Sequence, residues 1–158
     1  MAPRHTSWRV TTILVAVDFS PCGQHALHAA TRLASDLATG IRIVHAFEPN
    51  PRAPVMAGLG YRELFEELAA ELETGEAMQL TTWAQEARAG GIDVETEARP
   101  GREADVILGA AEAEDVFMLV LGTHGRSGFK KLVLGSVAQE VLQRASKPVL
   151  VVPQPPAQ

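Results

Sequence analysis

The segment with the strongest consequence for the fold is residues 116–137, VFMLVLGTHGRSGFKKLVLGSV. A short apolar run leads there into a glycine-rich loop, and the loop leads into the start of a helix. In α/β proteins this order presents backbone N–H groups to an anion at the carboxyl edge of a parallel sheet. The segment therefore predicts a parallel α/β sheet whose ligand is a nucleotide or another phosphate compound.

The spacing of the glycines distinguishes this loop from two common phosphate-binding loops. A Walker A loop needs a glycine five residues after its first, followed by Lys-Ser or Lys-Thr, whereas Ser127 stands there and the lysines come later. The dinucleotide pattern GxGxxG is also absent, because no two glycines of the loop are separated by one residue. What remains is G-x2-G-x9-G-S, formed by Gly122, Gly125, Gly135 and Ser136.

Strands and helices are expected to alternate along the chain. Apolar and β-branched runs of strand length occur at 10–17, 41–47, 92–98, 116–121 and 148–152. Helical apolar spacing runs from the cap at Ser20-Pro21 to a stop at Gly40, and again at 61–89, 103–113 and 135–144. This alternation predicts a single α/β domain, residues 1–158, on an open, doubly wound five-stranded parallel sheet. Residues 1–9 and 154–158 are expected to be flexible ends.

Three connections carry more specific expectations. Residues 92–98 alternate apolar and acidic side chains, which is typical of an edge strand with one wetter face. Arg99-Pro100-Gly101 is expected to turn the chain into the next helix. Residues 48–60, rich in proline and glycine, form either a lid over the ligand or a surface insertion.

At its glycines the chain resembles the universal stress protein family, whose nucleotide-binding members carry the same G-x2-G-x9-G-S/T pattern. The resemblance covers nearly the whole chain, in ILVAVDFS at 13–20, IVHAF at 43–47, VLGTHGRSG at 120–128, GSVAQEVL at 135–142 and SKPVLVVP at 146–153. It implies the ATP-binding branch of that family and a Rossmann-like fold of the adenine nucleotide alpha hydrolase-like type. It also implies strand order 3-2-1-4-5, which reverses between the first and fourth strands.

The resemblance further implies a site. In the ATP-binding branch the residue matching Asp18 lies beside the adenine, the residue matching Ala46 backs the ring, and the glycine loop and Gly-Ser-Val turn hold ribose and phosphates. We therefore expect ATP, with Mg²⁺, to contact Val17, Asp18, Ala46, Gly122, Thr123, His124, Gly125, Arg126, Gly128, Gly135, Ser136 and Val137. No catalytic residue and no protein ligand of a metal is expected.

Some of these residues also have purely structural explanations. Gly122 and Gly125 suit a tight turn with positive φ. Asp18 suits an Asx turn or a cap of the helix that follows it. Ser136 suits the cap of the last helix, a role compatible with phosphate binding. The cationic side chains of the loop, His124 and Arg126, suit either a phosphate or a solvated loop tip.

Composition restricts the partners. A formal charge of −5 and a pI near 5.5 argue against nucleic acid. Cations that could still form a local positive spot are Arg102, Arg126, Lys130 and Lys131. The longest apolar run, 116–121, is far shorter than the roughly 20 residues that span a bilayer, and the first ten residues lack the apolar core of a secretory signal. We therefore expect a cytoplasmic protein that uses neither nucleic acid nor membrane.

The remaining candidate groups are weak. The single cysteine, Cys22, excludes an internal disulfide and has no predictable redox partner. His25 and His28 stand three apart on the first helix, but no further Cys, His or carboxylate cluster completes a metal site with them.

The function that these patterns predict is a cytoplasmic stress-response protein that binds Mg-ATP and acts as a nucleotide-dependent regulatory module. A homodimer through the apolar edge strand 148–152 is expected, together with a protein partner that the sequence does not identify. One alternative is slow ATP hydrolysis or autophosphorylation, with Asp18 on the metal and His124 or Ser127 reacting. The other is a structural or signalling module without nucleotide, against which the intact glycine pattern argues.

Overall fold

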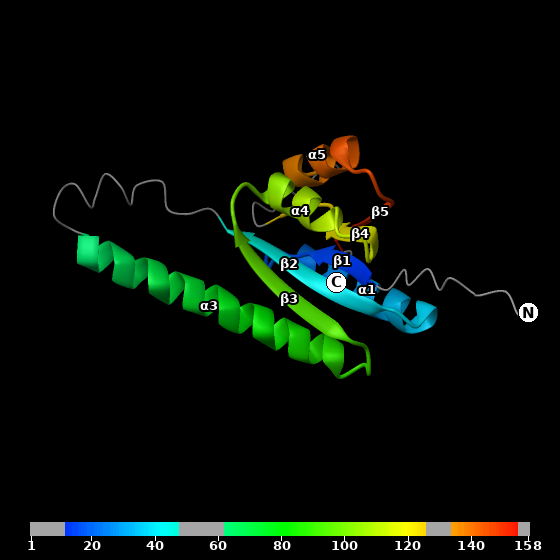
Figure 1. Cartoon of the computed structure of the whole chain (residues 1–158), viewed down its shortest axis with the longest axis horizontal. Coiled ribbons are helices and arrows are strands. Elements are labelled where there is room, and N and C mark those ends of the chain that lie inside the picture. Colours follow the sequence, from blue (N-terminus) through cyan, green and yellow to red (C-terminus); the bar gives the residue numbers. More distant parts are fainter. Residues whose placement is uncertain (1–11, 48–61, 126–133, 155–158) are drawn as a thin grey trace, which may run out of the picture.

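The computed structural model describes residues 12–47, 62–125 and 134–154. The predicted loop at 48–60 and the predicted flexible ends fall outside these ranges, apart from residue 154. In chain order the elements are β1 (Thr12–Ala16), α1 (Pro21–Leu37), β2 (Gly40–Phe47), α3 (Arg62–Arg88), β3 (Val94–Pro100), α4 (Glu103–Ala111), β4 (Val116–Gly122), α5 (Ser136–Arg144) and β5 (Val149–Val152), labelled as in Figure 1.

The five strands form one parallel sheet in the order β3-β2-β1-β4-β5, which confirms the predicted fold class. The central strand β1 lies between β2 and β4. Chain connections leave these strands toward different faces of the sheet, so the carboxyl ends of β1 and β4 border a crevice, as at other switch points of doubly wound sheets.

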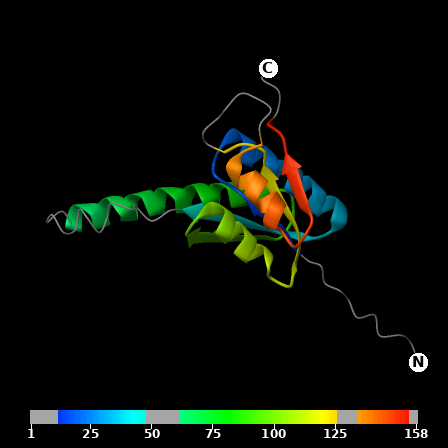
Figure 2. The same cartoon turned by 90° about the horizontal axis from the view of Figure 1, so that it is seen from above.

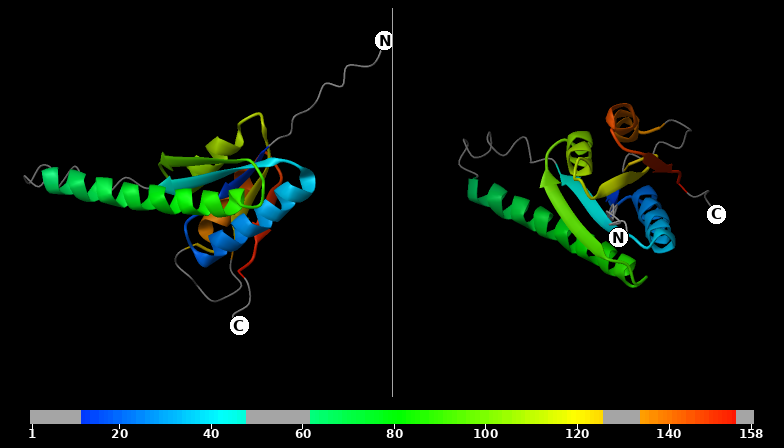
Figure 3. Two further views of the ribbon diagram at one scale, coloured as in Figure 1. Left: turned by 90° about the horizontal axis from the view of Figure 1, so that it is seen from below. Right: turned by 45° about the vertical axis from the view of Figure 1, so that its right-hand side comes forward.

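Helices cover both faces of the sheet. Helices α1 and α3 lie on one face and α4 and α5 on the other (Figures 1 and 3). The side chains of β1 alternate between the two cores, since Ile13 and Val15 pack toward α1 and α3 while Leu14 packs toward α4. All three are fully buried, which explains why this strand reads as a continuous apolar run. Helix α3 continues well beyond the sheet (Figure 2). In the described part of the chain, no helix is both long and apolar enough to cross a membrane.

The end of α1 differs from the prediction. Ser20 caps the helix and Pro21 begins it, as expected, but the helix ends at Leu37 and not at Gly40. Ala38 takes the left-handed conformation, with φ 50°, and its N–H bonds back to the carbonyls of the last turn. Gly40 instead begins β2 and pairs with Thr12, because alignment with β1 sets the start of that strand.

The third strand also differs from the prediction. It runs from Val94 to Pro100, and Pro100 pairs with Phe47, so the turn into α4 is at Gly101, with φ 140°, and not at Arg99-Pro100-Gly101. On the side of this edge strand that faces α3, Val94 is buried but Thr96 and Ala98 are exposed. The carboxyl-terminal part of α3 covers the start of β3, and the two elements then diverge (Figure 1).

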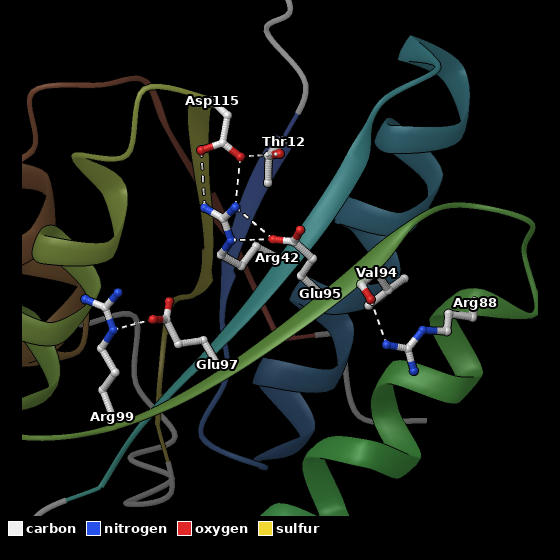
Figure 4. Close-up of polar contacts among 8 residues, drawn as sticks. All are labelled: Thr12, Arg42, Arg88, Val94, Glu95, Glu97, Arg99 and Asp115. Atoms are coloured by element: carbon white, nitrogen blue, oxygen red, sulfur yellow. Dashed lines mark hydrogen bonds and ion pairs between the residues drawn. The ribbon is translucent and has the colours of Figure 1, made fainter.

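Charged side chains connect neighbouring strands near their amino-terminal ends (Figure 4). Arg42 bonds to Asp115 through Nη2 at 2.8 Å and to Glu95 through Nε at 2.9 Å. Thr12 donates its hydroxyl to Asp115 at 2.9 Å. The hydrogen bond from Arg42 lowers the pKa of the Asp115 carboxyl below its ordinary value. The cluster thus links β1, β2 and β3 with Asp115, the residue directly before β4.

Candidate functional site

A cavity of about 310 Å³ lies at the switch point, at the carboxyl ends of β1, β2 and β4. Its lining combines the turn after β1, the loop after β4 and the first turns of α4 and α5. The lining residues are Ala16, Val17, Asp18, Gly23, Val44, Ala46, Glu103, Ile107, Leu121, Gly122, Thr123, His124, Gly125, Gly135, Ser136, Val137 and Ala138. The volume is at the lower end of the range for small-molecule sites.

Every predicted site residue within the described ranges lines this cavity. These residues are Val17, Asp18, Ala46, Gly122, Thr123, His124, Gly125, Gly135, Ser136 and Val137. The other two predicted residues, Arg126 and Gly128, lie outside the described residues, as do Ser127, Lys130 and Lys131. The topology therefore brings segments that are more than a hundred residues apart in the chain to one place. That they bind a nucleotide stays a prediction.

The glycines at the end of β4 are needed for close packing and not for positive φ. Among the described glycines only Gly91 and Gly101 have a positive φ, so the tight-turn explanation of Gly122 and Gly125 is wrong. A Cβ on Gly122 would lie 2.7 Å from Cys22 Sγ, and a Cβ on Gly125 would lie 2.9 Å from Asp18 Oδ2. The end of β4 therefore approaches the first turn of α1, and the loop after β4 approaches the turn after β1, more closely than a Cβ permits.

Backbone hydrogen bonds bring the two ends of the glycine loop together. The N–H of Gly135 donates to the carbonyl of Thr123 at 2.7 Å, and the N–H of Thr123 donates to the carbonyl of Val152 at 3.0 Å. This places the start of α5 beside the end of β4. Gly135 is the N-cap of α5, and no side chain caps the helix there. Ser136 is the first helical residue, so its predicted alternative role as the cap is wrong.

Asp18 has a structural role in addition to its place in the cavity wall. Its Oδ1 accepts hydrogen bonds from the N–H of Ser20 at 3.1 Å and from the hydroxyl of Ser20 at 2.6 Å. The same hydroxyl accepts from the N–H of Gly23 at 3.0 Å, which caps α1. This is the predicted Asx turn, and it holds the Asp18 carboxylate next to the N-terminus of α1. The two explanations of Asp18 are therefore compatible.

One wall of the cavity is apolar, and sequence reasoning missed most of it. Cavity residues that were not predicted are Ala16, Gly23, Val44, Glu103, Ile107, Leu121 and Ala138. The ends of the predicted strands were a signal for three of these residues. Ala16 and Leu121 each immediately precede a predicted site residue, and Val44 lies two residues before Ala46. No comparable signal existed for Ile107, which reaches the cavity only because α4 packs across the ends of β1 and β2.

His124, His25 and Cys22 each have polar contacts in the described structure. Nδ1 of His124 lies 2.9 Å from the hydroxyl of Thr123, while its buried Nε2 has no hydrogen-bond partner in the described structure. His25 contacts the carbonyl of Pro153 through Nδ1 at 2.8 Å. Cys22 is 2% exposed, and its Sγ lies 3.7 Å from the hydroxyl oxygen of Thr123 and 3.6 Å from the carbonyl oxygen of Val152. Within the described ranges no group of three metal-ligating side chains occurs.

Arg102 does not contribute to a free positive spot. Its guanidinium pairs with Glu140 of α5 and Asp105 of α4, and Arg144 bonds to the same two carboxylates. Hydrogen bonds from the two arginines lower the pKa of Glu140. This network joins α4 to α5, and the amino-terminal parts of both helices line the cavity.

Known proteins share this sequence and fold. Residues 9–153 match the model of the Universal stress protein family. Universal stress protein YxiE of Bacillus subtilis is 32% identical over 143 residues, which cover 89% of this chain and 97% of YxiE. The solved structure of protein MJ0577 of Methanocaldococcus jannaschii is 26% identical, with a TM-score of 0.79 and coverage of 94% of this chain and 99% of that one.

A third protein shares the fold at lower identity. The universal stress protein of Archaeoglobus fulgidus, solved in complex with dAMP, is 23% identical with a TM-score of 0.60, and the match covers 90% of this chain and 97% of that one. The parallel sheet, the glycine pattern and a family match over almost the whole length agree, and the chain belongs to the universal stress protein family.

Proposed function

We propose that this protein binds ATP, as its Mg²⁺ complex, in the switch-point cavity and acts as a cytoplasmic, nucleotide-dependent regulatory module. The observation that carries the proposal is the composition of the cavity wall. An apolar surface lies next to an uncapped helix N-terminus and a glycine loop, and these suit the two chemically different halves of a nucleotide.

The apolar wall suits a base. Val44, Ala46, Ile107 and Leu121 line it with small or medium aliphatic side chains, and Asp18 stands at its border as a hydrogen-bond acceptor. An adenine amino group or a ribose hydroxyl can donate to that carboxylate. An adenine nucleotide is also the ligand in the solved complex of the Archaeoglobus relative, which supports the choice of base.

The opposite side suits phosphates. Gly125, Gly135 and the first turn of α5 line the cavity there, and the helix start lacks a capping side chain. The N–H groups of a first helical turn have no partner within the helix and lie at the positive end of its dipole. A phosphate at this position would bond to them directly.

The metal would arrive with the nucleotide. Mg²⁺ in nucleotide sites is usually held by phosphate oxygens and water with one or two carboxylates. The described residues contain no group of three metal-ligating side chains, whereas two carboxylates, Asp18 and Glu103, line the cavity. The cavity thus fits a metal carried on the phosphates better than a resident metal site.

The substitution Ser136→Glu tests the proposal without weakening the fold. Ser136 is exposed at the first position of α5 and lines the cavity. A carboxylate there stabilises the helix through its dipole but repels the phosphates. By isothermal titration calorimetry we expect affinity for ATP to fall at least about tenfold, with affinity for uncharged adenosine retained.

A matched control carries the same charge outside the cavity. Gln139 is an exposed residue of the same helix that does not line the cavity, so Gln139→Glu should leave both affinities unchanged. Equal ATP affinity in Ser136→Glu and parent protein would place the phosphates elsewhere and refute the proposal.

A homodimer is the second element of the proposed function. β5 is an edge strand that pairs only with β4 in the described structure, and Leu150 in it is 38% exposed. An apolar edge strand offers unpaired backbone groups to a second copy of itself.

A further inference from the structure

His45 is a buried side chain that the proposed nucleotide contacts do not include. It lies near the end of β2, is 3% exposed, and points away from the cavity toward α3. Its Nδ1 lies 2.9 Å from the carbonyl oxygen of Val17. Because a carbonyl oxygen only accepts, Nδ1 must be the donor and carry a proton.

This hydrogen bond lies at the point where β1 leaves the sheet. The ladder between β1 and β2 ends with Ala16 paired to Val44, followed by one last bond from the N–H of Val17 to the carbonyl of Val44. The carbonyl of Val17 then accepts from the His45 side chain. The imidazole thus satisfies a buried backbone group and permits the chain to turn toward the cavity.

Phe19, on the other side of Asp18, depends on the same imidazole. It has φ 60°, an uncommon and strained value for a bulky residue. Its ring lies 4.4 Å from the His45 ring, centroid to centroid, and 5.3 Å from that of Trp83 in an edge-on arrangement. Packing from β2 and α3 therefore holds the strained residue in place. Asp18, which lines the cavity, stands between two residues that both contact His45.

Helix α3 contacts the imidazole from its other side. Oε2 of Glu76 lies 3.5 Å from Nε2 of His45, and that nitrogen has no hydrogen-bond partner among the described residues. Trp83 of the same helix packs on Phe19. A continuous series of contacts thus runs from α3, on one face of the sheet, to the turn that borders the cavity.

We propose that His45 is a positioning residue for the nucleotide site. By bonding the Val17 carbonyl and supporting the Phe19 ring, it keeps the turn between β1 and α1 in the conformation that presents Asp18 to the cavity. This inference rests on the proposed function, and it predicts that residues outside the cavity control nucleotide affinity.

Two substitutions of His45 separate positioning from packing. His45→Leu keeps an apolar side chain but removes the donor, whereas His45→Asn supplies an N–H near the place of Nδ1. If the turn keeps its binding conformation in one tenth of the molecules, the apparent Kd rises tenfold. By calorimetry we expect ATP affinity to fall about tenfold or more in His45→Leu and to return to within about threefold of the parent in His45→Asn.

A second measurement needs no nucleotide. The N–H of Ser20 donates to Asp18, so its hydrogen exchange, followed by NMR, reports whether the turn is intact. We expect faster exchange at Ser20 in His45→Leu and near-parent exchange in His45→Asn. Val94→Ala serves as the control, because Val94 is buried in the core on β3, away from the turn. It should lower stability while leaving both the ATP affinity and the exchange rate at Ser20 unchanged.

The outcomes separate this inference from the proposed function. A folded His45→Leu protein with parental ATP affinity and parental exchange at Ser20 would overturn the positioning role, even if its stability were reduced. If the parent protein itself failed to bind ATP, the proposed function would be wrong. The exchange rate at Ser20 in the nucleotide-free variants would then still decide whether His45 holds the turn.

Discussion

Replacing Gly122 by alanine tests the close approach on which the geometry of the site depends. The added Cβ would lie 2.7 Å from Cys22 Sγ and 3.2 Å from the backbone C and O of Cys22. Cys22 is buried in the first turn of α1, so relief requires α1 to shift against β4. Overpacking of this kind costs about 1–3 kcal/mol. We expect the free energy of unfolding to fall by about 2 kcal/mol and Tm by about 4–8 °C, as measured by urea and thermal denaturation.

A second substitution identifies the atom responsible. Cys22→Ala removes Sγ, the nearest contact, and should cost about 1 kcal/mol alone, since it deletes one buried heavy atom. In the double variant the clash with Sγ is gone and only the 3.2 Å backbone contacts remain. We therefore expect the two costs not to add, with a coupling of about 1 kcal/mol in favour of the double variant.

A matched glycine serves as the control. Gly109 is exposed in α4, and a Cβ there would meet nothing within 4 Å. Gly109→Ala should stabilise the protein by about 0.5–1 kcal/mol, because alanine favours the helix. Strictly additive costs at Gly122 and Cys22, or a Gly122→Ala protein as stable as the parent, would refute the reasoning about close approach.

Two further predictions concern the edges of the sheet. Asp115→Asn should lower the free energy of unfolding by about 1 kcal/mol at pH 7, discounted because the carboxylate is partly exposed. The folded-state pKa of Asp115 is lowered, so its contribution is complete above the unfolded pKa of about 4 and is lost as pH falls through the folded value. Equal differences between parent and variant at pH 7 and pH 3 in urea denaturation would contradict this assignment. Leu150→Lys should release monomers in sedimentation experiments, while Leu37→Lys, at an exposed position of α1, should not. A parent protein that sediments as a monomer with and without ATP would exclude the dimer.

Element boundaries show where local sequence information was insufficient. The strands were recognisable because buried parallel strands need continuous apolar runs, and the cap at Ser20-Pro21 was recognisable because its chemistry is local. The end of α1 was predicted wrongly because glycine is the usual stop signal, whereas pairing with β1 drew Gly40 into a strand. Thr96 and Ala98 have the alternation of a half-buried strand, yet they are exposed because α3 diverges from β3.

The sequence by itself determined the alternation of strands and helices, because these follow from short-range patterns. Its glycine spacing carried the family resemblance, and the resemblance implied ten of the described residues that line the cavity. Only the tertiary structure shows why particular residue types are required at these positions. Gly122 and Gly125 are glycines because segments a hundred or more residues apart in the chain approach so closely that a Cβ would lie less than 3 Å from the opposing side chain. The apolar wall at Ile107 and the contacts of His45 likewise depend on how helices cross the sheet. No local pattern encodes such distances, since they arise only when the two faces of the sheet are packed.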